Sequence, residues 1–190
     1  MILMLAGLAL FILSHGFTTM RDQRAAVIAR IGEVPYKLVY SLVSVIAVLM
    51  IGYGYGDWRA EGSAVLWDPP VWTRHLSLLL MLLASVMLMA AYSAGRIKAT
   101  LKHPMLVSVK TWSIAHLLAN GDAATIVLSL GILAWAVYAR ISLKRREPTK
   151  PLGPRGWAGD ALAVGGGIVL YLFLAYIFHP FVVGVPVMPS

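Results

Sequence analysis

Long apolar stretches alternate with short polar segments along the whole chain. Six of these stretches approach the roughly 20 residues that a helix needs to cross a bilayer. They cover residues 1–19, 36–55, 73–95, 104–119, 123–140 and 160–178. The pattern predicts an all-α, polytopic membrane protein with six transmembrane helices, formed as a single domain over residues 1–190.

The composition agrees with this interpretation. The chain is 59% hydrophobic and its mean hydropathy is +0.79, whereas soluble domains are about 45–50% apolar. The lipid bilayer is therefore the expected partner. The sequence has no cysteine, which excludes disulfides, iron–sulfur clusters, thiolate haem ligands and a cysteine nucleophile.

The net charge of +8 orients the protein rather than indicating a nucleic-acid partner. Most of the 16 Lys and Arg residues lie in alternate connections, namely Arg21, Arg24, Arg30 and Lys37; Arg96, Lys98 and Lys102; and Arg140, Lys144, Arg145, Arg146, Lys150 and Arg155. Basic connections favour the cytoplasmic side, so both termini are expected outside and no nucleic acid is expected. No basic segment precedes the first apolar stretch, so we expect residues 1–20 to remain in the mature protein.

Three connecting features carry further expectations. Segment 20–35 is basic and partly amphipathic, so it either extends the first helix into the cytoplasm or lies on the anionic inner leaflet. Residues 144–158 are rich in Pro, Arg and Lys and are expected to form a cytoplasmic linker. The Gly-Gly-Gly run at 165–167 predicts close packing of the last span on a neighbouring helix.

Ionisable side chains inside the predicted spans are the main functional candidates, because they are costly in a bilayer. His15 in the first span and His116 in the fourth each allow two interpretations: a packing histidine bonded to a carbonyl, or a ligand of a metal or haem iron. Two histidines from different helices facing a bundle interior predict a haem b site. We favour His15 with His116. The pair of His15 and His103 stays open, because His15 and His116 differ in depth along their helices.

The fourth span sorts its polar residues onto two faces. Trp112, His116 and Asn120 recur every four residues and share one stripe. Trp112 is therefore a candidate pocket wall and Asn120 a candidate cofactor-binding residue. His103 and Lys110 lie seven residues apart on another face, so His103 and His116 are not expected to bind one small ligand from the same side.

Two basic side chains could meet the propionates of a haem. Lys110 either extends to the cytoplasmic interface or pairs with a buried anion such as a propionate, and Arg21 is the second candidate. His103 precedes Pro104, which predicts a helix start with proline at its first position. His103 itself is either an interfacial histidine or a cofactor ligand.

The remaining polar residues have structural interpretations. Asn120-Gly121-Asp122 predicts a turn between two helices, with Asp122 as the N-cap of the second. His75 and His179 are expected to be structural residues at the outer face. Pro180 is expected to end the last helix.

Three motifs together resemble the NnrU family. They are LSHGFTT in the first span, KHPML followed by W-x-x-A-H-L-L-A-N-G-D in the fourth, and a closing HP-x-x-x-G-V-P. NnrU proteins are bacterial membrane proteins associated with denitrification, and they are similar to plant 15-cis-ζ-carotene isomerase. The resemblance covers nearly the whole chain.

The resemblance implies a haem b ligated by His15 and His116 in a bacterial inner-membrane protein with periplasmic termini. It also implies either redox-dependent isomerisation of a lipophilic substrate such as a polyene, or a supporting role in nitrogen-oxide respiration. Two positions depart from the relatives. Ser113 stands where the plant enzyme has a cysteine, and Lys102 stands where relatives commonly have arginine, which binds anions through a wider fork of donors.

Two other classes remain open. A basic residue, His and Pro opening a membrane helix also resembles isoprenylcysteine carboxyl methyltransferases, in which this region helps to bind S-adenosylmethionine. Alternatively, the protein is a haem-free assembly factor or small transporter whose polar residues tie helices together. The substrate, the redox partner and the oligomeric state are not predicted.

Overall fold

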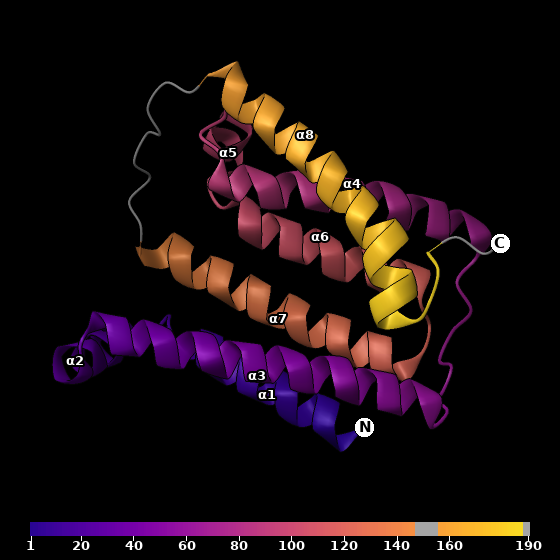
Figure 1. The fold of residues 1–190 in the computed structure, drawn as a ribbon, viewed down its shortest axis with the longest axis horizontal. Coiled ribbons are helices and arrows are strands. Elements are labelled where there is room, and N and C mark those ends of the chain that lie inside the picture. The colour runs from indigo at the N-terminus through magenta and orange to yellow at the C-terminus, as the bar shows by residue number, and fades with distance from the viewer. Residues whose placement is uncertain (147–155, 188–190) are drawn as a thin grey trace. The chain divides into compact units, whose positions relative to one another are not determined.

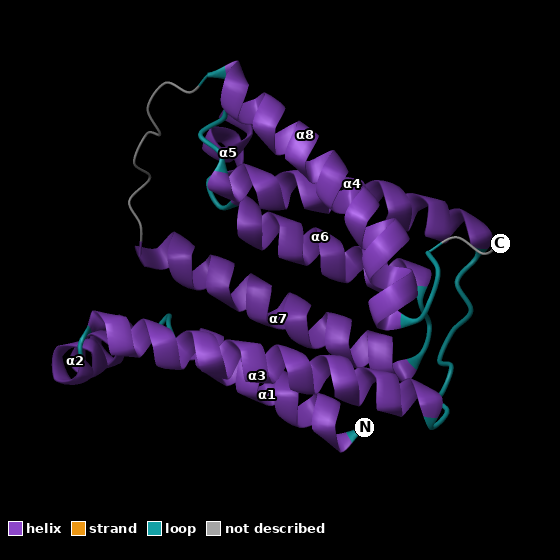
Figure 2. Cartoon of the chain, viewed as in Figure 1, coloured by secondary structure: helices purple, strands orange, loops and turns teal. Residues whose placement is uncertain are grey.

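The computed structural model describes residues 1–146 and 156–187, and these fold almost entirely as helices (Figures 1 and 2). The elements in chain order are α1 (Ile2–Phe17), α2 (Arg21–Ile31), α3 (Glu33–Ala60), α4 (Val71–Tyr92), α5 (Arg96–Leu101), α6 (Pro104–Ala119), α7 (Ala123–Arg146), α8 (Trp157–Phe173) and the π-helix η1 (Leu174–Val183). The predicted all-α class is confirmed. Most of the linker predicted at 144–158 lies outside the described residues.

The described helices form two compact units. The first unit consists of Met1–Asp68 and Gly121–Arg146, and the second of Pro69–Asn120 with the described part of Glu147–Ser190. The expected single domain stays a prediction.

Within the described residues, four helices are long and apolar enough to cross a membrane, namely α3, α4, α7, and α8 continued by η1, and the bent pair of α1 and α2 would make a fifth if it formed one span. Large apolar side chains on the helix surfaces support a lipid environment, since Leu13 is 71% exposed and Val169 is 67% exposed. The predicted multi-pass membrane protein is thus confirmed, but the count of six spans is not. Helices α1 and α6 have 16 residues each, about 24 Å, which is shorter than a hydrocarbon core of about 30 Å.

Local sequence signals explain where several helices begin. Pro104 occupies the first turn of α6 and His103 is its N-cap residue, as predicted. Asp122 caps α7 as predicted, because its Oδ1 accepts the backbone N–H of Thr125 at 3.0 Å and its Oδ2 accepts the Thr125 hydroxyl at 2.7 Å. These bonds satisfy donors that a helix start leaves without a partner.

Helix α2 turns sharply away from α1 instead of extending it. The two helices are bent by 89°, and α2 packs against the start of α3 (Figure 1). The expectation that segment 20–35 lengthens the first helix is therefore wrong. The alternative, that this basic segment lies on the inner leaflet, stays a prediction.

Close packing in the first unit depends on glycine. Helices α1, α3 and α7 run alongside one another (Figure 1). A Cβ atom at Gly54 of α3 would overlap the backbone nitrogen of Met4 in α1, and one at Gly7 of α1 would lie 2.7 Å from the Met50 Cβ. Both positions therefore need a residue without a side chain, as is common where membrane helices approach closely.

In the second unit, α4 packs against both α6 and α8. The predicted glycine contact is confirmed: a Cβ at Gly167 would lie 2.5 Å from the Val86 Cα. The Ser108 hydroxyl of α6 donates a hydrogen bond of 2.7 Å to the Ala84 carbonyl of α4. Small residues and hydroxyl bonds thus contribute to the packing of these helices.

The last helix does not end at Pro180, contrary to expectation. It continues to Val183 as the π-helix η1 and ends at Gly184, which has the left-handed φ of 74°. Proline lacks an N–H and its ring clashes with the preceding turn of an α-helix. The wider π-helical turn accommodates Pro180 without ending the helix.

Candidate histidine sites

His15 in α1 has one ring nitrogen bonded to its own helix and the other available. Its Nδ1 lies 2.9 Å from the carbonyl oxygen of Phe11. A carbonyl oxygen only accepts, so Nδ1 carries the proton and Nε2 keeps its lone pair. This is the tautomer that a metal-binding imidazole presents, with the second nitrogen fixed by a backbone carbonyl.

Aromatic rings surround His15. The Phe11 ring stacks on the imidazole with ring centroids 3.8 Å apart. Trp135 of α7 and Tyr40 of α3 each have ring centroids 5.3 Å from that of His15. Three helices of the first unit therefore fix the orientation of this imidazole.

The first unit also holds buried polar atoms that lack a hydrogen-bond partner among the described residues. They are the Arg24 Nε, the Tyr36 hydroxyl, the Trp135 indole nitrogen and the Ser129 hydroxyl. The Arg24 guanidinium lies 5.5 Å from the Tyr36 ring centroid, and Tyr36 stacks on Tyr40 with centroids 6.3 Å apart. Each of these groups can donate a hydrogen bond, so each would suit an anionic or carbonyl acceptor.

Sequence reasoning proposed Arg21 for this role and missed Arg24. Arg21 is exposed as the first residue of α2. Arg24 lies one turn further along the helix, where α2 packs against α3. The available signal was the spacing of Tyr36 and Tyr40 at i and i+4, which places two tyrosines on one face near the start of α3.

His116 in α6 shows the same arrangement as His15. Its Nδ1 lies 2.9 Å from the Trp112 carbonyl oxygen, so Nε2 again keeps the lone pair. The Trp112 ring lies against the imidazole, with centroids 4.3 Å apart. The Asn120 side chain donates to the His116 carbonyl at 3.1 Å. The predicted stripe is therefore confirmed, while cofactor binding by Trp112 and Asn120 stays a prediction.

His103 and Lys110 lie at the start and in the middle of α6. His103 is half-buried at the start of α6. Lys102 before it has φ 62° and ψ −45°, and the His103 N–H bonds the Leu101 carbonyl at 2.7 Å. This is a tight and strained γ-turn. Lys110 is half-buried along α6, and no carboxylate in the described ranges forms a salt bridge with it.

His179 is the residue whose position sequence reasoning missed. Its ring lies 6.4 Å from that of His116 between centroids, with planes 25° apart. Its Nδ1 lies 2.7 Å from the Leu174 carbonyl oxygen. His179 was expected to be a structural residue at a helix end, because Pro180 was expected to end the helix. The chain carried no local signal that η1 brings it to His116.

The donor set fits haem better than an enclosed metal ion. Residues 1–146 and 156–187 contain no group of three or more His, Cys, Asp or Glu that could hold a metal ion, whereas a structural zinc site needs four ligands. What the chain offers is imidazoles with Nε2 free, as haem iron uses. His15 belongs to the first unit and His116 and His179 to the second, so the pair of His15 and His116 stays a prediction.

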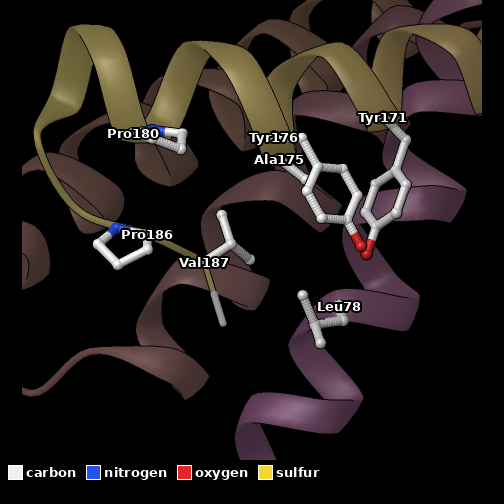
Figure 3. A pocket seen from close by; sticks show the side chains of 7 residues that line it. All are labelled: Leu78, Tyr171, Ala175, Tyr176, Pro180, Pro186 and Val187. Atoms are coloured by element: carbon white, nitrogen blue, oxygen red, sulfur yellow. The ribbon is translucent and has the colours of Figure 1, made fainter. Parts of the chain in front are cut away.

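A small cavity lies beside η1 in the second unit (Figure 3). Its volume is about 90 Å³ and its lining is Leu78, Tyr171, Ala175, Tyr176, Pro180, Pro186 and Val187. The lining is apolar apart from two tyrosine hydroxyls, which both extend toward Leu78 in Figure 3. Such a lining suits a small hydrocarbon group beside a polar one.

Comparison with known proteins adds one finding. No curated protein and no solved structure matches the chain. The family model described as NnrU protein matches residues 3–187, which include both units and His15, His116 and His179. This protein is therefore a member of the NnrU family.

Proposed function

We propose that this NnrU protein is an integral membrane haem b protein in which His116 and a second histidine bind the iron. The resemblance gives the second place to His15. The observation that carries the proposal is the shared tautomer: both imidazoles donate Nδ1–H to the carbonyl four residues earlier and leave Nε2 as the free nitrogen.

The surrounding residues have complementary roles in this proposal. Trp112 forms a wall against His116 and keeps water from it. Arg24 and Tyr36 offer donors to a carboxylate near His15, in addition to the predicted Arg21 and Lys110. A propionate bound by such donors would keep its negative charge, since hydrogen bonds to the charged form favour it.

Bound haem would supply a one-electron couple and an iron centre that binds ligands. We propose that the protein uses this chemistry in the bacterial inner membrane, with its termini periplasmic, on a lipophilic substrate such as a polyene. The resemblance to ζ-carotene isomerase supports this class of substrate, whereas the cavity of about 90 Å³ beside η1 has room only for a small hydrocarbon group. Support of nitrogen-oxide respiration is the alternative use of the same centre.

The test is the absorption spectrum of the detergent-purified protein, oxidised and dithionite-reduced, with a pyridine haemochrome assay for stoichiometry. We expect about one haem per chain and a low-spin spectrum, both altered in His116→Ala. His75→Ala is the matched control, because His75 is exposed on α4. An unchanged Soret band and reduced spectrum in His116→Ala would contradict the assignment.

A wild-type protein without haem, even after growth with haem precursor and reconstitution with hemin, would refute the proposal. Binding of S-adenosylmethionine that is lost in His103→Ala would then favour the methyltransferase interpretation.

A further inference from the structure

His116 has an imidazole neighbour within its own unit. The ring of His179 in η1 lies 6.4 Å from the ring of His116 in α6, measured between centroids, and the two planes differ by 25°. Helices α6 and η1 are separated by more than 50 positions in the sequence, so this contact results from tertiary packing. Both histidines are half-buried.

The distance between the two rings matches a particular ligand geometry. A metal–nitrogen bond of about 2.0–2.1 Å, with about 1.1 Å from Nε2 to the ring centre, puts each centroid about 3.2 Å from a metal. Two imidazoles on opposite sides of one metal then have centroids about 6.4 Å apart, whereas two at a tetrahedral angle have centroids about 5.2 Å apart. The observed separation of 6.4 Å equals that of the opposed pair, and two histidines that bind one haem iron are opposed in this way.

Both histidines also present the same nitrogen. Each has Nδ1 bonded to a backbone carbonyl, that of Trp112 for His116 and that of Leu174 for His179, so each keeps a lone pair on Nε2. His179 reaches the carbonyl five residues earlier rather than four, as the wider turn of a π-helix allows. Such π-helical segments occur frequently at functional sites.

The backbone carbonyl of His179 is also hydrogen-bonded. Its carbonyl accepts the N–H of Gly184, the residue at the end of η1, and that of Val185 at 3.2 Å. The side chain and the carbonyl of His179 are therefore both bonded within the last helix. A ligand needs this kind of fixed orientation, which residues outside the first coordination sphere supply.

We infer that His179, rather than His15, is the axial ligand opposite His116. The inference rests on the proposed haem and changes only the second ligand. It places both iron ligands in the second unit, one from α6 and one from η1. His15, with its aromatic neighbours and nearby donors, then has a role other than ligation.

The test compares His179→Ala and His15→Ala with His75→Ala as the control, using absorption and electron paramagnetic resonance spectra at matched haem content. We expect His179→Ala to change from low-spin to high-spin and His15→Ala to stay low-spin. Imidazole added to His179→Ala should restore the low-spin spectrum, which it would not do if the residue were only structural.

His179→Met gives a second measurement that does not depend on an empty ligand position. A thioether opposite His116 should keep the iron low-spin and raise the reduction potential relative to wild type. This variant also keeps a side chain of substantial size in η1, which protects the fold if His179→Ala is unstable.

Two results would overturn the inference and leave the proposed haem in place. One is a His179→Ala variant whose spectrum stays low-spin, as in wild type. The other is a His15→Ala variant that becomes high-spin and returns to low-spin when imidazole is added. Both alanine variants could also become high-spin. In that case the inference is supported if added imidazole restores the low-spin spectrum in His179→Ala and not in His15→Ala, and any other pattern overturns it. A wild-type protein without haem would overturn the proposed function and the inference together.

Discussion

The contact between α1 and α3 allows a quantitative test of how the first unit is held together. Gly54 and Gly52 lie two residues apart in α3. A Cβ at Gly54 would overlap the Met4 backbone nitrogen and lie 2.8 Å from the Leu3 carbonyl carbon, whereas a Cβ at Gly52 would meet nothing within 4 Å. Gly54→Ala and Gly52→Ala therefore make the same chemical change in the same helix and differ only in what the new methyl group contacts.

The magnitude follows from that comparison. Replacing glycine by alanine inside a helix favours the helix by about 0.5–1 kcal/mol, and this gain is common to both variants. Gly54→Ala must also push the backbone of α1 away, because carbon atoms in contact lie about 3.5–4.0 Å apart. Such overpacking costs about 1–3 kcal/mol. We expect Gly54→Ala to be less stable than Gly52→Ala by about 2 kcal/mol.

The assay is thermal unfolding of both variants and wild type in one detergent, followed by circular dichroism. A difference of about 2 kcal/mol corresponds to about 4–8 °C in Tm for a chain of this length. Gly52→Ala should unfold at or above the wild-type temperature. If Gly54→Ala were as stable as Gly52→Ala, the close approach of α1 and α3 at Met4 would be refuted.

Two further predictions concern the second unit. The buried Asp160 accepts the Ile97 N–H at 2.9 Å, so Asp160→Ala should reduce the free energy of unfolding by about 1–3 kcal/mol, and Asp160→Asn by less, because the amide oxygen can still accept. Chemical denaturation in detergent measures both, and equal losses in the two variants would refute the bond. Ser108→Ala should cost about 0.6–1.7 kcal/mol by removing the bond to Ala84. Ser93→Ala, which loses only a 3.5 Å bond within three residues, serves as its control, and an equal effect would contradict the role of the contact between helices.

The sequence predicted best the features that depend on neighbouring residues. The bounds of α6 agree with the expected 104–119 because Pro104 and the Asn-Gly-Asp turn act locally. The packing of Gly167 was predictable because small residues mark close helix contacts in lipid.

Features that depend on tertiary packing could not be predicted. Nothing near Pro180 indicates that the helix widens instead of ending, and the contact of His116 with His179 joins segments far apart in the sequence. The buried donors of Arg24, Tyr36 and Trp135, which lack a partner among the described residues, likewise come from three helices, α2, α3 and α7. An apolar stretch shows that a helix crosses a membrane but not how far it rotates about its axis.

The low burial of the spanning helices has a consequence for how the sequence can change. Within the most apolar window of each span, only 11–22% of residues are buried inside the protein, and the buried apolar set is mostly alanine. Lipid accepts one aliphatic side chain about as well as another, so most positions could exchange Leu, Ile and Val at little cost. In a saturation-mutagenesis experiment the intolerant positions would be the small residues, which are the least noticeable part of the sequence.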